Sequence, residues 1–487
     1  MYNAKIYYNS SEFESSTKEV IDVTCPVDGK VIGTVQKASL SDTHDCLQAA
    51  HDATKEWAAL TATKRGQYVN QLADILEANK EELATILSME HGKILSEAIG
   101  EIEGGIGFLR YANENARRIE GMITTSDYHN ERTWFEKVPY GVTVGILAWN
   151  FPLALACRKI GNSLVAGNTM VVKPPTETPL TVMKFGELAM KSDLPKGVLG
   201  FITGTGREVG NALVSDKLTQ LVTLTGSTGA GRQLYKAAAE NITVLHLELG
   251  GKAPFIVMDD ADLDKAVEAA VVSRFANCGQ ICTCNERMYI HENVYEEFKT
   301  RFLEGVKKIK VGPSLDPTTT MGPKVNKAEV DKLIDLVNVS VSEGGKVIYD
   351  GKDEAYTADL EAKYPNGTWC YPRVVEVYDN ANILMHEETF GPIAPMMKIS
   401  SFDQALEYAN DCEYGLSAYL FTNNAKNIMR ATRELEFGEL YINRQNGEQI
   451  NGFHNGFKLS GVGGEDGKYG FESYMQIKTV YMNWDIK

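Results

Sequence analysis

Five short apolar runs alternate with four helix-like segments between residues 142 and 249, and this order limits the fold more than any other feature. The runs are 142–147, 169–172, 199–202, 221–224 and 244–249, and the segments between them are 153–166, 180–192, 208–215 and 229–240. Neighbouring parallel strands need a long crossover between them, which is usually a helix. The alternation therefore predicts an α/β fold built on a parallel sheet.

The rest of the chain adds other elements to this unit. Residues 23–35 predict a hairpin, because Asp28-Gly29 supplies turn chemistry between two β-prone runs. Residues 39–119 are helical in pattern, residues 134–138 resemble a strand, and a second α/β series covers residues 253–443. The tail, 476–484, is β-prone with few charges. It is expected either to pair with another subunit or to finish a sheet of its own chain.

Length and charge narrow the class of protein. A chain of 487 residues is too long for one core, so two or three domains are expected. A net charge of -16 opposes binding to nucleic acid or anionic lipid, and no run of eighteen apolar residues occurs. The first residues show no secretion signal, and eight cysteines are too few for a disulfide framework. These features predict a cytoplasmic protein with no membrane or nucleic-acid partner.

Two glycine-rich turns lie between a predicted strand and a predicted helix. One contains Gly204, Gly206 and Gly210, whose spacing departs from the standard dinucleotide fingerprint. The other is Gly226-Ser227-Thr228-Gly229-Ala230-Gly231. Either turn could bring backbone N–H groups close to a pyrophosphate. Either could equally be a tight turn that needs positive φ, so the glycines alone leave both interpretations open.

Three thiols at Cys278, Cys282 and Cys284 predict chemistry more specifically. A zinc site is disfavoured, because no second Cys pair or His pair supplies a fourth ligand, and we expect no metal. Buried structural cysteine is the better interpretation for Cys278 and Cys284. A nucleophile needs a base and an oxyanion donor. Glu248, near the end of an apolar strand, and Asn150, directly after another, are candidates, although each alone could be structural.

Together these residues resemble the aldehyde dehydrogenase superfamily, and the resemblance covers essentially the whole chain. Six ordered matches at consistent spacings are far more specific than any single motif. The resemblance implies a Rossmann-like cofactor domain, an α/β catalytic domain and a small β arm for oligomerisation. The matching segments are Trp149-Asn150-Phe151-Pro152, Lys173-Pro174-Pro175-Thr176, Thr225-Gly226-Ser227, Glu248-Leu249-Gly250-Gly251-Lys252, Gly279-Gln280-Ile281-Cys282 and Glu387-Glu388-Thr389-Phe390-Gly391-Pro392.

The resemblance also implies domain boundaries. Residues 1–120 and 140–250 would form the NAD(P)-binding domain, and residues 251–445 the catalytic domain. Residues 121–139 and 470–487 would be the oligomerisation strands of a homo-oligomer, a dimer or a tetramer.

Catalytic roles follow from the same resemblance. Cys282 is similar to the nucleophile that attacks the aldehyde carbon and forms a thiohemiacetal. Asn150 and the Cys282 backbone N–H would stabilise the oxyanion. Hydride transfer then leaves a thioester, and Glu248 would activate the water that hydrolyses it. The residues expected to contact the cofactor are Trp149, Lys173, Thr176, Gly226, Ser227, Glu388 and Phe390.

Thr176 carries the prediction of cofactor preference. Lys173 matches a lysine that faces the adenosine ribose, and many NAD-specific members carry Glu three residues later. Here that position is Thr176, which leaves Lys173 free to pair with a 2′-phosphate. We expect NADP to be preferred and NAD accepted. In the alternative interpretation, the neighbouring Glu177 binds the ribose hydroxyls instead.

The expected substrate is a short 2-hydroxyaldehyde, since the chain most resembles bacterial lactaldehyde and glycolaldehyde dehydrogenases. Arg158, Thr283 and His454 would line the pocket, with Arg158 and His454 bonding the 2-hydroxyl. Arg158 could instead be a structural ion-pair partner and His454 a loop residue. Thr283 departs from the Asn usual in that group, although its hydroxyl can still bond an oxygen.

Rival activities lack residues that they usually need. Succinate-semialdehyde enzymes usually carry a second Arg where Ala276 stands, and glyceraldehyde-3-phosphate enzymes of the superfamily an Arg where Ile281 stands. CoA-acylating enzymes typically lack the base that Glu248 would provide. An inactive structural protein on this fold would be expected to have lost Cys282, Glu248 or Asn150.

Overall fold

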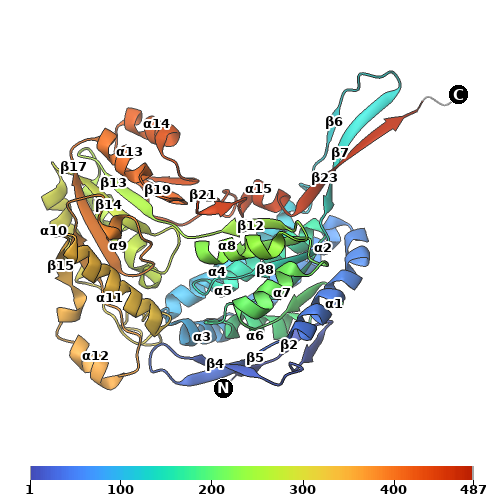
Figure 1. Ribbon diagram of the computed structural model, residues 1–487, viewed down its shortest axis with the longest axis horizontal. Coiled ribbons are helices and arrows are strands. Elements are labelled where there is room, and N and C mark those ends of the chain that lie inside the picture. Colours follow the sequence, from blue (N-terminus) through green and yellow to red (C-terminus); the bar gives the residue numbers. More distant parts are fainter. Residues whose placement is uncertain (1, 485–487) are drawn as a thin grey trace.

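Two large sheets and a projecting arm make up the computed structural model, which describes residues 2–484 (Figure 1). Each large sheet lies in its own lobe with helices packed against it. This is the mixed α/β architecture expected from the sequence. Within residues 2–484 no helix has both the length and the apolar character that crossing a membrane requires.

The first sheet has eight strands in the order β22-β12-β11-β8-β9-β10-β2-β3. Its parallel centre confirms the predicted alternation, and the side chains of these central strands are almost all buried. Burial on both faces explains why the strands are continuous apolar runs. The central strands and their crossover helices are β8 (Val142–Ile146), α5 (Pro152–Ala166), β9 (Thr169–Lys173), α6 (Leu180–Ala189), β10 (Leu199–Phe201), α7 (Asn211–Ser215), β11 (Leu221–Thr225), α8 (Thr228–Ala238) and β12 (Val244–Glu248).

One predicted helix differs from its expected form. Residues 208–215 were expected to be continuous, but a π-helical turn covers Gly206–Gly210 before α7 begins. The turn starts at Thr205, whose side chain accepts a hydrogen bond from the Glu208 N–H at 3.2 Å. Wider turns of this kind often occur at functional sites.

The N-terminal segment covers one side of the first sheet. The predicted hairpin is confirmed: β4 and β5 pair antiparallel on either side of Asp28-Gly29, where Gly29 has a φ of 72°. The predicted helical region forms four helices that bury apolar stripes. These elements are β1 (Tyr2–Ala4), β2 (Ile6–Tyr8), β3 (Ser11–Phe13), β4 (Val20–Thr24), β5 (Val31–Gln36), α1 (Leu40–Ala59), α2 (Ala62–Ala78), α3 (Lys80–His91) and α4 (Leu95–Asn115).

The second sheet has seven strands in the order β15-β16-β17-β14-β13-β19-β20, and all pairs are parallel except β15 with β16. It arises from the predicted second α/β series. Its elements are β13 (Ala253–Val257), α9 (Leu263–Phe275), β14 (Asn285–His291), α10 (Tyr295–Val306), α11 (Lys327–Ser342), β15 (Lys346–Asp350), α12 (Thr357–Lys363), β16 (Arg373–Glu376), β17 (Ile393–Ile399), α13 (Phe402–Asn410), β19 (Ser417–Phe421), α14 (Ala425–Glu434) and β20 (Glu439–Ile442).

After β20 the chain returns to the first lobe. Strand β22 (Gly461–Val462) pairs antiparallel with β12, while β21 (Phe457–Lys458) pairs with β18 (Tyr414–Gly415) of the second lobe. The segment therefore passes between the lobes beside the end of β12. Helix α15 (Gly467–Glu472) then packs against α5.

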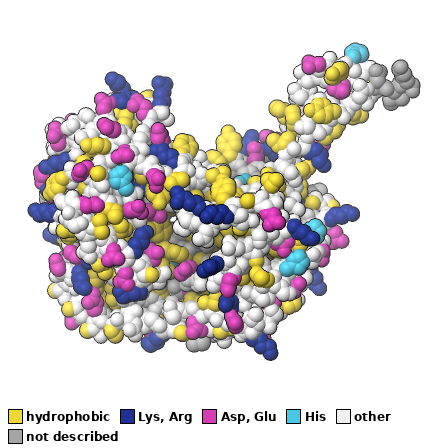
Figure 2. Space-filling model, viewed as in Figure 1, with side chains coloured by type: hydrophobic (Ala, Val, Ile, Leu, Met, Phe, Trp, Pro, Cys, Tyr) yellow, Lys and Arg dark blue, Asp and Glu magenta, His cyan; other side chains and the backbone are white. Residues whose placement is uncertain are grey.

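The tail forms the arm. Strand β23 (Met475–Asn483) pairs antiparallel with β7 (Glu131–Pro139), which also pairs with β6 (Met122–Thr124). The predicted tail strand is therefore present, and it joins neither large sheet; residues 485–487 of the predicted segment lie outside the described residues. Figure 2 shows hydrophobic side chains along this projection. The exposed apolar residues there are Met122, Ile123, Tyr128, Ile477, Tyr481, Met482 and Trp484.

Candidate active site

The three residues predicted to carry the chemistry come together where the two sheets meet. Glu248 is the last residue of β12, and Asn150 follows β8 in the same sheet. Cys282 precedes β14 of the second sheet. A Cβ built on Gly251 would overlap the carbonyl oxygen of Cys282, so the chain just after Glu248 runs directly against the cysteine loop. The Asn150 Nδ2 also donates to that loop, to the Gln280 carbonyl at 3.1 Å.

The cysteine loop is held in an unusual backbone conformation. Asn277, Cys278 and Gly279 have φ angles of 51°, 58° and 70°, and the first two are uncommon for residues that carry a side chain. Glu97 from α4 accepts the Asn277 N–H at 2.7 Å, which fixes the start of this turn. Strain of this kind persists only where the surroundings over-determine the conformation.

A buried ion pair supports the Asn150 turn. The Lys93 Nζ lies 2.6 Å from Glu101 and donates to the Asn150 carbonyl at 2.7 Å. The Glu101 carboxylate also accepts the Leu153 N–H at 2.9 Å, at the start of α5. Sequence reasoning missed Lys93 and Glu101. Both residues lie in the region 39–119 that the sequence predicts to be helical, and their charge was the only sign of a role in supporting the site.

Glu248 is buried without a hydrogen-bond partner for either carboxylate oxygen among the described residues. Its nearest charged group is His454, whose Nε2 lies 3.6 Å away. Burial raises the pKa of Glu248 to about 8, although His454 and Arg158 act in the opposite direction. A carboxyl with this pKa exchanges protons near neutrality, as a general base must.

The three neighbouring cysteines lie in different surroundings. Cys282 is half-buried, whereas Cys278 and Cys284 are buried. Burial raises the pKa of Cys278 well above its ordinary value and that of Cys284 to about 12. The Arg274 Nη2 contacts the Cys284 sulfur at 2.9 Å within the core. These surroundings favour structural roles for Cys278 and Cys284, as the sequence predicted.

The predicted substrate residues belong to one network around Cys282. Arg158 is paired with Asp466 at 2.8 Å and Glu465 at 3.7 Å, and its guanidinium lies over the Phe108 ring. Arg158 therefore forms the ion pairs that the structural interpretation of this residue predicted. These ion pairs do not remove the residue from the pocket, because Arg158 also acts electrostatically on Glu248 and Glu448.

Thr283 and His454 each contact a carboxylate that sequence reasoning missed. The Thr283 hydroxyl donates to Glu448 at 2.9 Å, and the His454 Nδ1 lies 2.9 Å from a Glu439 oxygen. The two glutamates lie on either side of one short strand: Glu439 begins β20, and Glu448 lies in the loop after it. Nothing in the local pattern marks these carboxylates as pocket residues.

Three of the predicted cofactor residues, Trp149, Glu388 and Phe390, lie near the turns that carry Asn150 and Glu248. The Trp149 ring packs edge-on against Phe390 at 5.3 Å, and the buried Lys324 Nζ lies 5.4 Å from the Trp149 ring centre. Glu388 accepts the Gly251 N–H at 2.8 Å, and burial raises its pKa to about 7. This part of the site is therefore joined to the turn after Glu248.

Lys173 is the last residue of β9, and Ser227 follows the end of β11; β8 lies between these two strands in the sheet. The Lys173 Nζ is buried, and its only hydrogen bond in the described structure is to the Pro174 carbonyl at 3.0 Å. Burial lowers its pKa to about 8. Thr176 is half-buried three residues later. Ser227 caps α8 by accepting the Ala230 N–H at 3.2 Å, and the Gly226 N–H donates to the Glu248 carbonyl at 2.9 Å.

Comparison with known proteins decides the family. A family model described as "Aldehyde dehydrogenase family" matches residues 13–480. This chain is a member of the aldehyde dehydrogenase family. It is 46% identical over 485 residues to the 3,6-anhydro-alpha-L-galactose dehydrogenase of Vibrio sp. (strain EJY3), with 100% of each chain covered. A solved structure of 3,6-anhydro-L-galactose dehydrogenase superposes with a TM-score of 0.95 at 47% identity, covering 99% of this chain and 100% of that one.

Other relatives differ in the substrates that they are named for. The lactaldehyde dehydrogenase of Escherichia coli (strain K12) is 38% identical, with 95% of each chain covered. The succinate-semialdehyde dehydrogenase [NADP(+)] of the same organism is 36% identical, with 99% of this chain and 98% of that one covered. Similarity therefore shows that this chain is an NAD(P)-dependent aldehyde dehydrogenase, an oxidoreductase. It does not distinguish between the substrates for which the relatives are named.

In this aldehyde dehydrogenase, Glu286 is a further positioning residue that the sequence did not reveal. Its buried carboxylate pairs with Lys252 at 2.7 Å and Arg274 at 3.0 Å. It also accepts the N–H groups of Thr389 and Phe390 at 2.9 and 3.0 Å. Burial would raise its pKa, but the two cations lower it far below the usual range. Glu286 thus joins two of the six family motifs, those of residues 248–252 and 387–392, to Arg274 on α9.

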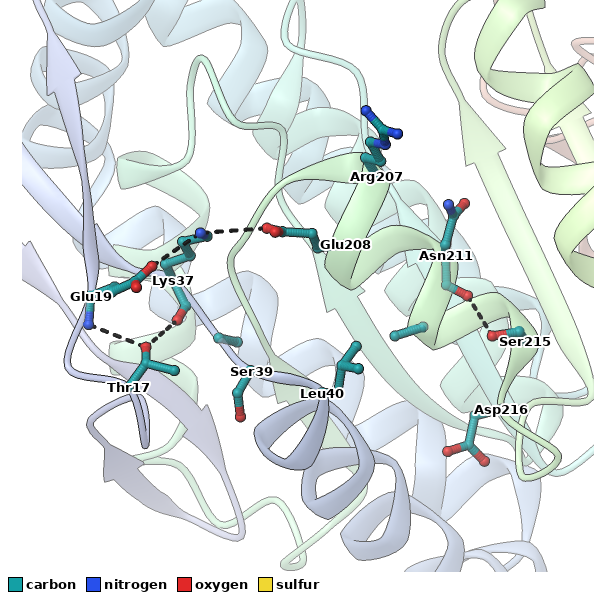
Figure 3. Close-up of a pocket in the computed structure, with 12 residues that line it drawn as sticks. Thr17, Glu19, Lys37, Ser39, Leu40, Arg207, Glu208, Asn211, Ser215 and Asp216 are labelled. Carbon is teal, nitrogen blue, oxygen red and sulfur yellow. Dashed lines mark hydrogen bonds and ion pairs between the residues drawn. The ribbon is translucent and has the colours of Figure 1, made fainter.

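A separate pocket of about 730 Å³ lies between the N-terminal segment and α7, and no predicted site residue lines it. Figure 3 shows Lys37 between Glu19 and Glu208, at 3.0 and 3.7 Å. Its cation is already paired with two anions, and the pocket contains no nucleophilic thiol. The residues predicted to carry the chemistry lie elsewhere, where the two sheets meet.

The close approach of Gly251 to Cys282 generates a prediction. Gly251→Ala should lower kcat/KM at least about a hundredfold, because an alanine methyl must displace the backbone of the predicted nucleophile. We expect the free energy of unfolding to fall by only about 1–3 kcal/mol. The matched control is Gly100→Ala in α4, where nothing lies within 4 Å of the added methyl. That variant should keep full activity, and wild-type kcat/KM in Gly251→Ala would contradict the assignment.

Proposed function

We propose that this aldehyde dehydrogenase oxidises an uncharged 2-hydroxyaldehyde to the carboxylic acid, with NADP preferred and NAD accepted. The observation that carries the substrate proposal is the acidic pocket around Cys282. Glu248 and Glu448 act electrostatically on the thiol, and Glu439 and Asp466 act on the neighbouring His454. Arg158 is already paired with Asp466. Such a pocket accepts hydrogen bonds from hydroxyl groups and opposes a second carboxylate on the substrate.

The proposed nucleophile is Cys282. Its thiolate attacks the aldehyde carbon, a C–S bond forms, and the carbonyl π electrons move to the oxygen. Asn150 donates to that oxyanion. One of its two amide hydrogens is bound by the Gln280 carbonyl, which orients the group and leaves the second hydrogen free for the substrate. Bound NADP supplies the acceptor for the hydride that leaves the substrate carbon.

The proposed base is Glu248. It takes a proton from water, and the water oxygen attacks the thioester carbon. The C–S bond then breaks and returns the thiolate of Cys282. Glu248 suits this role because both of its oxygens are free of hydrogen bonds within the described residues and its pKa is raised to about 8. A base that is neither paired nor fully ionised near neutrality can take and release a proton in each turnover.

The residues proposed to hold the cofactor fit its chemistry. The start of α8 at Gly226 and Ser227 offers N–H groups to a pyrophosphate. Lys173 is a buried amine with only a carbonyl acceptor, so a 2′-phosphate would complete its surroundings. Gly250 keeps the path beside Glu388 open, since a Cβ there would lie 2.7 Å from its carboxylate. Trp149, Thr176 and Phe390 complete the proposed set.

The arm is the proposed contact between copies of the chain. It exposes seven large apolar side chains on or next to the strands of a three-stranded sheet, whose two outer strands each have one unpaired edge. Burying such a surface against a second copy favours a homo-oligomer, a dimer or a tetramer.

The two large sheets have separate proposed roles. The eight-stranded sheet is assigned to cofactor binding, and the seven-stranded sheet to the nucleophile. Because its eight cysteines are all free thiols, a reducing compartment such as the cytoplasm is the proposed location.

The first prediction tests the covalent mechanism. Glu248→Gln should release a burst of about one reduced cofactor per active site and then stall, because the thioester forms but its water is not deprotonated. The slow step of the wild-type enzyme should accelerate as pH rises through about 8, since Glu248 acts as a base only after losing its proton. Stopped-flow absorbance measures both. Absence of a burst in Glu248→Gln would contradict the proposed order of steps.

The second prediction tests cofactor preference. Thr176→Glu places a carboxylate where a 2′-phosphate would lie, and like charges about 4 Å apart repel by about 4 kcal/mol at an effective dielectric constant near 20. We expect kcat/KM for NADP to fall at least about tenfold and NAD to be affected much less. The matched control, Glu177→Gln, removes the exposed neighbouring carboxylate and should leave the NADP/NAD ratio unchanged. A changed ratio only in the control would support Glu177 as the ribose ligand.

The third prediction tests the substrate class. Lactaldehyde or glycolaldehyde should exceed propionaldehyde or acetaldehyde by about ten- to a hundredfold in kcat/KM, because buried polar groups are left unpaired by the analogue. A hydroxylated sugar aldehyde of the kind that names the Vibrio relative belongs in the same panel. His454→Ala should reduce this ratio more than it slows the unhydroxylated substrates.

Asp466→Asn provides the opposing measurement. It releases Arg158 from its 2.8 Å ion pair, so the ratio of succinate semialdehyde to lactaldehyde turnover should rise about tenfold or more. Wild-type preference for succinate semialdehyde would overturn the substrate proposal and favour the semialdehyde alternative.

A further inference from the structure

The imidazole of His454 contacts three groups with different chemistry. Its Nδ1 lies 2.9 Å from Glu439, its Nε2 lies 3.6 Å from Glu248, and the ring interacts with the thiol of Cys282, whose pKa it lowers. The residue is buried. Its backbone is fixed by a pair of hydrogen bonds with the backbone of Glu465, at 2.9 and 2.8 Å, which sets the position from which the ring projects.

We propose that Cys282, His454 and Glu439 form a thiolate–imidazolium–carboxylate relay, in which His454 activates the nucleophile before substrate arrives and Glu439 positions the ring. This inference rests on the proposed role of Cys282 as the nucleophile. It assigns His454 a task beyond hydroxyl recognition, and it gives Glu439 a task where none was predicted.

The relay answers a physical problem at the nucleophile. Burial raises the pKa of the Cys282 thiol, and Glu448 and Glu248 raise it further, whereas the hydrogen bond and the charge of His454 lower it. Without a cation nearby, a thiol among carboxylates would stay protonated and unreactive at neutral pH. Arg158 is paired with Asp466 and Glu465, and His454 is the cation that acts on the thiol.

Charged side chains from five parts of the chain surround the imidazole. Burial alone would lower the pKa of His454, but Glu248 from β12 and Glu439 from β20 raise it well above its ordinary value. Asp466, before α15, and Glu448, in the loop after β20, also feel the charge of His454. Arg158 from α5 opposes these anions. The net surroundings are anionic, which favours the imidazolium form.

The proton balance of the relay is simple. In the resting pair one proton is bound to Nε2 of His454 and the sulfur carries the negative charge. Nδ1–H donates to Glu439, which keeps the ring oriented. Attack forms the C–S bond while the imidazolium keeps its proton. When water hydrolyses the thioester, the C–S bond breaks and the thiolate returns to the imidazolium, while the proton taken from water leaves through Glu248.

The experiment measures the reactivity of Cys282 without substrate. The full chain with NADP is labelled with iodoacetamide across a range of pH, and mass spectrometry follows the peptide that carries Cys282. The labelling rate reports the thiolate fraction. The variants are His454→Gln, Glu439→Gln and Glu448→Gln, each with its thermal unfolding recorded.

Glu439→Gln and Glu448→Gln make a matched pair of variants, because simple Coulomb repulsion predicts a shift of the labelling profile in the same direction for both. Removing any anion near Cys282 should favour the thiolate and shift the labelling profile to lower pH. The relay predicts this shift for Glu448→Gln only. Glu439→Gln should shift the profile to higher pH, because His454 loses the partner that stabilises its charge and orientation. His454→Gln should shift it upward by about one unit, or about tenfold in labelling rate at neutral pH.

The relay is overturned if Glu439→Gln shifts the profile downward as Glu448→Gln does. It is also overturned if a folded His454→Gln retains the wild-type profile. Failure of the proposed function has a different signature. Cys282→Ala would then retain aldehyde oxidation, whatever the labelling profiles of the other variants show.

Discussion

The buried carboxylate of Glu286 joins segments that are far apart in the sequence, and the geometry of the site depends on it. Lys252 follows the end of β12, Arg274 lies on α9, and Thr389 and Phe390 lie in the turn before β17. A carboxylate buried with two cations and two N–H donors is stabilised only when all partners are present. Glu286 therefore fixes the turn after Glu248 and the turn that carries Glu388 and Phe390 as one unit.

Close backbone approach extends this unit to the nucleophile. Gly251 lies against the Cys282 carbonyl, and the same residue donates its N–H to Glu388. The left-handed residues Asn277 and Cys278 turn the chain toward Cys282, while the pair of Lys93 and Glu101 supports Asn150 from the first lobe. The predicted base, nucleophile and oxyanion donor are thus held by backbone contacts from both sheets, with little freedom in their separations.

Charge in the pocket links substrate choice to activation of the thiol. Arg158 is paired with Asp466 and Glu465, and the cation that acts on Cys282 is that of His454. The same carboxylates that raise the pKa of His454 favour hydroxyl donors over a second substrate carboxylate. The pocket proposed for an uncharged hydroxyaldehyde is therefore also one that stabilises an imidazolium beside the thiol. These two proposals depend on one set of charges but are separated by measurements with and without substrate.

The sequence by itself determined the α/β class, the order of nearly all central strands and helices, and membership of the aldehyde dehydrogenase family. These follow from local patterns: apolar runs on both sides of a crossover, the Asp28-Gly29 turn, and six motifs in a fixed order. The tail strand was predicted, but only the tertiary structure showed it paired with β7. Likewise, the π-helical turn at Gly206–Gly210 depends on capping by Thr205, which periodicity does not register.

The surroundings of the site were decided by the tertiary structure alone. Glu286, Glu439 and Asp466 are ordinary acidic residues in the sequence, and each gains its significance from partners that lie far from it along the chain. Arg158 could be named from the sequence, but not its ion pair with a residue 308 positions later. Motifs record the groups that touch the reacting atoms, whereas burial and the pairing of charges arise only when distant segments pack. For that reason the sequence predicted the candidate chemistry, and the fold decided its electrostatics.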